Sequence, residues 1–187
     1  MEAVFETILA RRSVRKYLET PVPQETLEKI INASLYAPSG ANRQPWHVAV
    51  ITNPALIAKV NAEMKAAVAR DESNRDRERV SADGYHVSLG APVLVIVSVD
   101  MTLAATGKED ASLLLGTMFL AAHALGVGTC WINQLKGLND EVLFRQFLGE
   151  LGVPVGNTII GAAAIGYAAG PLNPAPPRRE GTVTYIS

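Results

Sequence analysis

Three arginines and a serine stand within five positions near the start of the chain, in Arg11-Arg12-Ser13-Val14-Arg15. Guanidinium forks pair with phosphate oxygens, and a serine hydroxyl adds a neutral donor. The cluster is therefore either a phosphate-binding segment at the end of a helix or a basic patch on the surface. Two further arginines, Arg178 and Arg179, follow an apolar tail and are either solvated or within reach of a distant anion.

A polar turn held between prolines is the second feature that suits a ligand. The segment Pro38-Ser39-Gly40-Ala41-Asn42-Arg43-Gln44-Pro45-Trp46 offers several hydrogen-bond donors and acceptors and leads into a stretch of strand formers. The prolines fix part of the backbone and so restrict where these polar groups lie. Such a turn can hold the edge of a flat polar ring, and it can equally be a tight connection.

Motifs for several other chemistries are absent from the sequence. No G-x-G-x-x-G follows a predicted strand, and there is neither a phosphate loop of the G-x-x-x-x-G-K type nor a G-x-S-x-G elbow. The histidines His47, His86 and His123 match no metal spacing, and His123 is expected to be a satisfied core residue of an apolar helix. Cys130 has no cationic neighbour in the sequence, so we predict a structural thiol.

The composition limits the class of partner. The chain has 187 residues and a formal net charge of −1, so it has no basic excess for binding a nucleic-acid backbone. A single cysteine and an acidic N-terminus predict a cytoplasmic protein rather than a secreted one. Charged residues make up 19% of the chain, below the about 25% of an average domain, which hints that some surface is buried against a partner.

One stretch is long enough to raise the question of a membrane span. Residues Leu113 to Ile132 carry no charge, but Gly126-Val127-Gly128 interrupts them and no basic or aromatic belt flanks them. An apolar helix at the centre of a core has the same composition. We therefore favour a buried helix followed by a turn, and no membrane partner.

Periodicity and turn signals outline the remaining elements. Helices are predicted after Pro21-Val22-Pro23, after an Asn53-Pro54 cap, from Glu109 to Leu125, and from an Asn139-Asp140-Glu141 cap to Gly149; strands are predicted at 46–52, 92–99, 129–134 and 158–167. The charged stretch 70–83 is interpreted as a solvated helix face or mobile loop rather than a binding surface. The irregular order favours one α+β layered domain over residues 1–187 rather than a doubly wound fold.

The C-terminal arm, residues 170–187, is unusual for a monomer. Gly170 to Pro177 holds four prolines in eight positions, and Thr182 to Ile186 is rich in strand formers. A proline-rich segment of this kind is not helical and is semi-rigid where it is extended. It either wraps around a neighbouring subunit or ends as a strand in its own sheet.

Taken in order, several segments resemble the FMN-dependent nitroreductase family along nearly the whole chain. They are RRSVRKY (11–17), PSGANRQPWH (38–47), GAPVLVIV (90–97), ALGVGTCWI (124–132) and IGY (165–167), with the late arginines after them. The resemblance implies a central, mainly antiparallel sheet flanked by helices. It also implies a homodimer with shared active sites, in which the C-terminal arm and strand reach the partner subunit.

The same resemblance implies an FMN site, position by position. Four residues match the segment that holds the FMN phosphate and ribityl chain, namely Arg11, Arg12, Ser13 and Arg15. Arg178 and Arg179 match a C-terminal phosphate contact. Four more match a loop that packs on the flavin from the other subunit, namely Pro38, Ser39, Gly40 and Asn42. The backbone of Trp131, Ile132 and Asn133 matches a strand end that faces the flavin ring.

What the resemblance implies about function is an FMN-dependent oxidoreductase. NADH or NADPH would reduce the flavin and leave, and a small organic acceptor such as a nitroaromatic or a quinone would take its place in a ping-pong cycle. No catalytic side chain and no metal are expected, and backbone donors near Asn133 with a nearby cation would stabilise the reduced ring. The alternatives are a flavin-binding sensing or storage protein with little turnover, and a flavin-free interaction module.

Overall fold

The computed structural model describes residues 2–74 and 76–186; Met1, Arg75 and Ser187, which the predicted domain includes, lie outside these ranges. The elements run in the order α1 (Glu2–Ala10), α2 (Gln24–Ser34), the 3-10 turn η1 (Gly40–Asn42), β1 (Trp46–Ile51), α3 (Pro54–Arg70), α4 (Arg77–Ser81), β2 (Val93–Val99), α5 (Gly107–Ala124), β3 (Gly128–Ile132), η2 (Gln134–Leu138), α6 (Val142–Glu150) and β4 (Thr158–Gly166).

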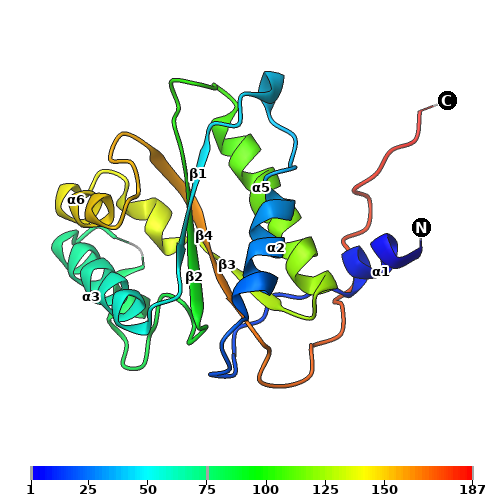
Figure 1. The fold of residues 1–187 in the computed structure, drawn as a ribbon, viewed down its shortest axis with the longest axis horizontal. Coiled ribbons are helices and arrows are strands. Elements are labelled where there is room, and N and C mark those ends of the chain that lie inside the picture. The colour runs from blue at the N-terminus through cyan, green and yellow to red at the C-terminus, as the bar shows by residue number, and fades with distance from the viewer. Residues whose placement is uncertain (1, 75, 187) are drawn as a thin grey trace.

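Within the described ranges, four strands form one sheet in the order β1-β2-β4-β3, and every neighbouring pair is antiparallel. Helices α2 and α5 lie on one side of this sheet, and α3 and α6 lie on the other (Figure 1). The predicted α+β layered fold with a mainly antiparallel sheet is therefore confirmed. The four predicted strands are also found, although 129–134 ends early because Gln134 begins a 3-10 turn.

The centre of the sheet is covered on both faces. All seven residues of β2 are buried, as expected for an unbroken apolar strand. The adjacent β4 is built largely from alanine and glycine, which leaves room for large neighbours. At Gly161 a Cβ atom would lie 2.6 Å from the Trp131 ring, so only glycine lets that indole pack against the sheet.

The predicted buried helix is α5, but its burial is one-sided. Leu114, Leu115 and Met118 are fully buried against the sheet and α2, whereas Leu113 is 49% exposed. The prediction of a buried helix is therefore confirmed for the face that packs on the sheet and α2, while the opposite face is exposed. None of the helices in the described part of the chain is long and apolar enough to cross a membrane.

The two predicted helix caps form on the other side of the sheet. The Asn53 side chain accepts hydrogen bonds from the backbone of Ala55 and Leu56 at the start of α3. The Glu141 carboxylate accepts from the Phe144 amide at the start of α6. The described residues of the charged stretch 70–83 are largely exposed around the short helix α4, which agrees with a solvated face.

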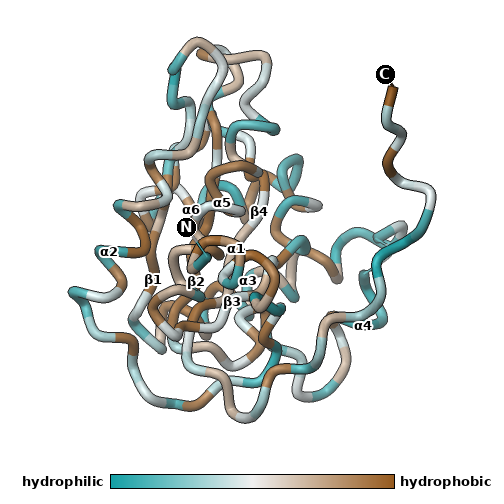
Figure 2. Tube along the Cα trace, turned by 90° about the vertical axis from the view of Figure 1, so that its right-hand side faces the viewer, coloured by the Kyte–Doolittle hydropathy of each residue, from teal (hydrophilic) through white to brown (hydrophobic). Residues whose placement is uncertain are grey.

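Both ends of the chain lie against little of the rest of the molecule. Helix α1 has no buried residue, and its Phe5 and Leu9 are 66% and 70% exposed. The C-terminal arm runs away from the body and is exposed throughout its described length (Figure 2). Residues 182–186 form no strand there, so the alternative of a terminal strand within the chain's own sheet is wrong.

Candidate functional site

The arginine segment is held on the open edge of β3. Immediately after α1 ends, Ser13 forms a parallel bridge with Thr129, and the Val14 amide donates to the Thr129 carbonyl over 2.9 Å. Val14 is 5% exposed, whereas Ser13 and Arg15 are exposed. This alternation follows from the extended backbone, which sends successive side chains to opposite sides. Ser13 and Arg15 are therefore directed outward.

The arginine segment and the C-terminal arm enclose a groove of about 750 Å³. Arg11, Arg12 and Arg15 lie on one wall, and Arg178 comes from the arm on the other. The structure thus brings together arginines that are far apart in the sequence, although Arg179 does not line the groove. Among the described residues that line it, none is acidic, so the groove concentrates positive charge without an internal counter-ion.

Two polar atoms beside this groove lack a partner among the described residues. They are Nε of Arg12 and Oγ1 of Thr129, and both are buried. Arg12 and Thr129 also line an adjoining hollow of about 190 Å³. Buried donors without partners are uncommon and call for an explanation. Several guanidinium groups and a hydroxyl around an acid-free groove are the donor set that a phosphate monoester requires, so the residues present fit the phosphate end of FMN.

Not every arginine is free to bind an anion. The Nη1 atom of Arg12 donates to the carbonyls of Leu9 and Arg11 over 2.6 Å each, which caps the end of α1. The Arg11 guanidinium lies 6.0 Å from the centre of the Phe119 ring. Arg15 makes only a long contact, 3.4 Å, to the Ser13 carbonyl. Arg11 and Arg15 are therefore the guanidinium groups with the most uncommitted donors in the segment.

The strand end at Trp131 to Asn133 contributes backbone rather than side chains. The Trp131 ring packs edge to face on Phe119 with centroids 6.4 Å apart, and Ile132 is 3% exposed in the core on the other face. Along an edge strand, alternate residues direct their amide and carbonyl away from the sheet. The backbone amide and carbonyl of Trp131 therefore point away from the sheet, as those of Thr129 do. The edge of β3 stays open beyond the Ser13 bridge.

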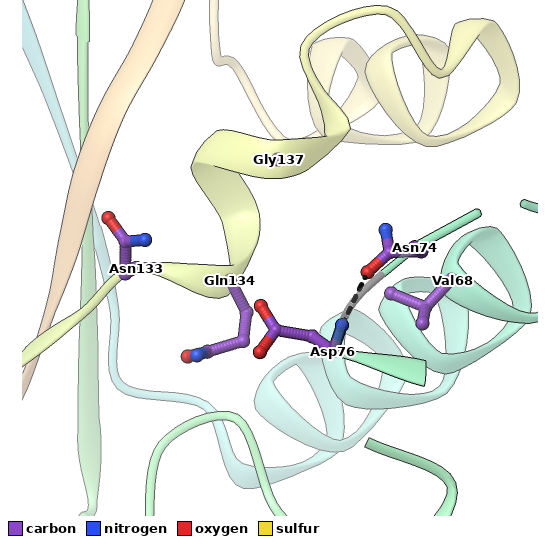
Figure 3. Close-up of a pocket in the computed structure, with 6 residues that line it drawn as sticks. All are labelled: Val68, Asn74, Asp76, Asn133, Gln134 and Gly137. Atoms are coloured by element: carbon purple, nitrogen blue, oxygen red, sulfur yellow. Dashed lines mark hydrogen bonds between the residues drawn. The ribbon is translucent and has the colours of Figure 1, made fainter. Parts of the chain in front are cut away.

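A polar cleft of about 190 Å³ opens at the end of β3 (Figure 3). The side chains of Asn133, Gln134, Asn74 and Asp76 line it, and the Asp76 carboxylate is directed toward the Gln134 side chain. Asn74 accepts a hydrogen bond from the Asp76 amide over 3.0 Å, which fixes the segment between α3 and α4. The sequence analysis missed Asn74, Asp76 and Gln134, because a charged, aperiodic stretch carries no signal of what it faces.

The phosphate groove and this cleft lie along the same strand. Thr129 lines the hollow beside the groove, and Asn133 lines the cleft four residues further on. At about 3.3 Å per residue, that separation is about 13 Å. This is comparable to the distance between the phosphate and the ring of an extended flavin mononucleotide, so one edge could hold both ends.

The loop from Pro38 to Gln44 has an unusual backbone. Ala41, Asn42 and Gln44 all have positive φ, at 51°, 53° and 47°, a conformation that residues other than glycine seldom adopt. The Ser39 hydroxyl accepts from the Gln44 amide over 3.1 Å, and the Asn42 carboxamide oxygen accepts from the Gln44 side chain over 3.1 Å. Clustered strain of this kind is typical of a loop shaped for a ligand or partner.

Within one chain, this loop lies far from the arginine segment. The Gly40 amide donates to Asp110 over 3.1 Å, near the first turn of α5. Arg11 and His123 line one hollow near its last turn. The 13 residues between Asp110 and His123 correspond to about 20 Å of helix at 1.5 Å per residue. Figure 1 shows η1 and α1 at opposite ends of α5.

Comparison with known proteins assigns the chain to a family. A model of the nitroreductase family matches residues 8–167. The chain belongs to the nitroreductase family. A crystal structure of a nitroreductase with bound FMN from Bacteroides fragilis superposes with a TM-score of 0.92 at 37% identity, covering 98% of each chain.

Two further relatives extend the comparison of this nitroreductase-family chain. A 4-nitrobenzoate reductase from Pseudomonas putida is 28% identical over 198 residues, 88% of this chain and 85% of its own length. An FMN reductase [NAD(P)H] from Bacillus subtilis is 26% identical over 182 residues, covering 93% and 71%. The chain spans only 64% of a longer relative from Methanothermobacter thermautotrophicus, at 32% identity over 143 residues.

Titratable groups beneath the site are structural in this family member. Burial raises the pKa of the Cys130 thiol, and the nearby Arg15 and Arg11 lower it less than burial raises it. Cations do adjoin Cys130 in space, contrary to the sequence-based expectation, but the thiol is not activated. Burial also raises the pKa of Tyr17, whose hydroxyl donates to Val14 and lies 3.2 Å from the Ala164 carbonyl. His123 is only half-buried, so its prediction as a core residue is wrong.

Proposed function

We propose that the protein is an FMN-dependent oxidoreductase that uses NADH or NADPH to reduce a small organic acceptor such as a nitroaromatic or quinone. One observation carries the proposal: unpartnered buried donors of Arg12 and Thr129 beside an arginine-lined groove that no described acidic residue neutralises. FMN bound in the Bacteroides fragilis structure and the names of the relatives support the same assignment. The cytoplasmic location stays a prediction.

The chain's own residues would hold and orient the cofactor. Arg11, Arg15 and Arg178 supply charge-assisted hydrogen bonds to the phosphate, and Ser13 and Thr129 add neutral donors. The open edge of β3 at Trp131 and Asn133 would present backbone groups to the ring. When bound, FMN would supply the redox chemistry, exchanging a hydride equivalent first with NAD(P)H and then with the acceptor, for which water would provide the additional proton.

Each site would be completed by a second copy of the chain. The strained Pro38 to Asn42 loop lies about 20 Å from the arginines of its own chain. A two-fold dimer can place that loop against the groove of its partner, because a closed two-fold interface uses the same surfaces twice. The exposed apolar residues of α1 and of the C-terminal arm support such an interface, since large apolar patches mark contact surfaces.

The test begins with the absorption spectrum of the purified protein before and after NADH or NADPH is added under argon. We expect a yellow protein that bleaches within seconds and regains colour when a nitroaromatic or quinone is added. Cofactor released by heat should chromatograph as FMN. A colourless protein, or recovery of FAD alone, would refute the assignment. Bound FMN that no nicotinamide reduces would instead indicate a sensing or storage protein.

A further inference from the structure

The cleft at the end of β3 contains a negative charge and no positive one among its described lining residues. Its lining is Val68, Asn74, Asp76, Asn133, Gln134 and Gly137. The Asp76 carboxylate points toward the Gln134 side chain (Figure 3). The sequence analysis expects a cation near Asn133, and within the described lining the structure has a carboxylate instead.

A counter-ion offsets this charge only in part. The Arg79 guanidinium contacts Asp76 through one 3.0 Å bond, but its side chain is 57% exposed and does not line the cleft. Arg79 also lies 6.0 Å from the centre of the Tyr85 ring, on the outer side of α4. An exposed ion pair of this kind is weak and screened by solvent. A molecule in the cleft therefore meets the carboxylate at close range and the guanidinium at longer range.

We propose that Asp76 sets the charge preference of the acceptor site, so that the enzyme favours neutral and cationic acceptors over anionic ones. The inference rests on the proposed function, in which the flavin ring lies along the edge of β3 and the cleft opens beside it at Asn133. The three carboxamides provide donors and acceptors for the polar groups of an acceptor, and Asp76 repels a carboxylate substituent. The Pseudomonas putida relative, by contrast, is named for an anionic acceptor, 4-nitrobenzoate.

The volume of the cleft limits the distance between Asp76 and a bound acceptor, and so sets how strongly Asp76 changes the binding of a charged acceptor. A volume of about 190 Å³ corresponds to a sphere about 7 Å across, which is the greatest separation between Asp76 and a charge held within it. With an effective dielectric constant of about 40, between the values for bulk water and for a protein surface, the Asp76 carboxylate alone disfavours a like charge at that distance by about five- to tenfold. The Arg79 guanidinium bonded to it reduces the net effect to about two- to threefold. An opposite charge is favoured by a similar factor.

The test uses three nitrophenyl probes that differ in charge: 4-nitrobenzoate, its methyl ester, and (4-nitrobenzyl)trimethylammonium. Holoenzyme is first reduced with NADH under argon, and reoxidation by each probe is then followed by stopped flow. This order separates acceptor selection from nicotinamide binding. For the wild-type protein we expect the second-order rate constant to be about two- to threefold lower for the anion than for the ester, and highest for the cation.

The isosteric substitution Asp76→Asn should reverse that charge series, because it leaves the Arg79 guanidinium without its partner carboxylate. The anion should gain about fivefold, the cation should lose a similar factor, and the neutral ester should change by less than about twofold. The control is Glu72→Gln, which removes one negative charge from an exposed position of the same segment outside the cleft. It should leave all three probes unchanged.

A second readout is independent of turnover. Binding of benzoate to the oxidised holoenzyme, followed through the flavin spectrum, should tighten about fivefold in Asp76→Asn and not in Glu72→Gln. Unchanged probe ratios and benzoate affinity in Asp76→Asn would overturn the inference, while NADH-reducible FMN would leave the proposed function intact. A protein whose flavin NADH does not reduce would overturn the proposed function itself.

Discussion

A mixed-dimer experiment tests most directly whether each site is built from two chains. One variant carries Arg11→Ala and Arg15→Ala, and a second carries Ser39→Ala and Asn42→Ala. The two sets lie about 20 Å apart in one chain, too far for one flavin contact to involve both loop and groove of the same subunit. Each homodimer should be nearly inactive, because both of its sites carry a defect.

The expected recovery follows from the symmetry of the dimer. When the variants are unfolded together and refolded, about half of the randomly formed dimers are mixed. In each mixed dimer one site collects both defects and the other collects none. NADH-driven reduction of a nitroaromatic should therefore return to about a quarter of the wild-type rate.

A matched control uses two lesions in the same segment. Mixing the Arg11→Ala, Arg15→Ala variant with an Arg15→Glu variant gives dimers in which every site is defective, so no activity should return. If the groove and loop variants also fail to complement, while each refolds to a dimer of normal size, the shared-site arrangement is refuted.

The remaining predictions concern single residues. Arg15→Ala should weaken FMN binding about ten- to a hundredfold in a fluorescence titration, because a charge-assisted phosphate contact contributes on the order of 1.5–3 kcal/mol. Lys16→Ala should weaken it much less, and equal effects would indicate a diffuse basic patch. Cys130→Ser should retain most NADH-dependent activity, since burial raises the pKa of that thiol, and loss of turnover with FMN bound would contradict this. Arg145→Ala should lower the free energy of unfolding in urea by about 2–4 kcal/mol, because the buried guanidinium donates to the carbonyls of Pro154, Val155 and Asn157. A change below about 1 kcal/mol would contradict a stabilising role for Arg145.

Local signals in the sequence predict the layers of this fold well. The alternation and length of apolar runs locate β1, β2 and β4, and the Asn53-Pro54 cap places the start of α3. These features depend on neighbours in the chain, so a sequence contains them directly. The one-sided burial of α5 could not be predicted in this way. The sequence shows that the helix is apolar but not which of its faces is covered.

The candidate site also contains features that the sequence predicts and features that depend on packing. The arginine segment and the polar turn stand out as clusters of residue types, and Arg178 lines the groove because the arm passes the end of α1. The cleft residues Asn74 and Asp76 meet Gln134 only through packing of the α3–α4 segment against η2. No spacing rule links positions some 60 residues apart, so their proximity could not be predicted from the sequence.

The open edge of β3 connects the fold to the proposed chemistry. An edge strand presents unpaired backbone groups, which proteins usually cover or blunt because they invite pairing with other chains. Here Ser13 and Val14 cover only the first part of the edge, and Trp131 continues beyond them. A cofactor along that edge would occupy the remaining backbone groups, and a partner's Pro38 to Asn42 loop would cover the cofactor. In the proposed dimer, the edge that is a liability in one isolated chain would thus become the platform of a site that two chains complete.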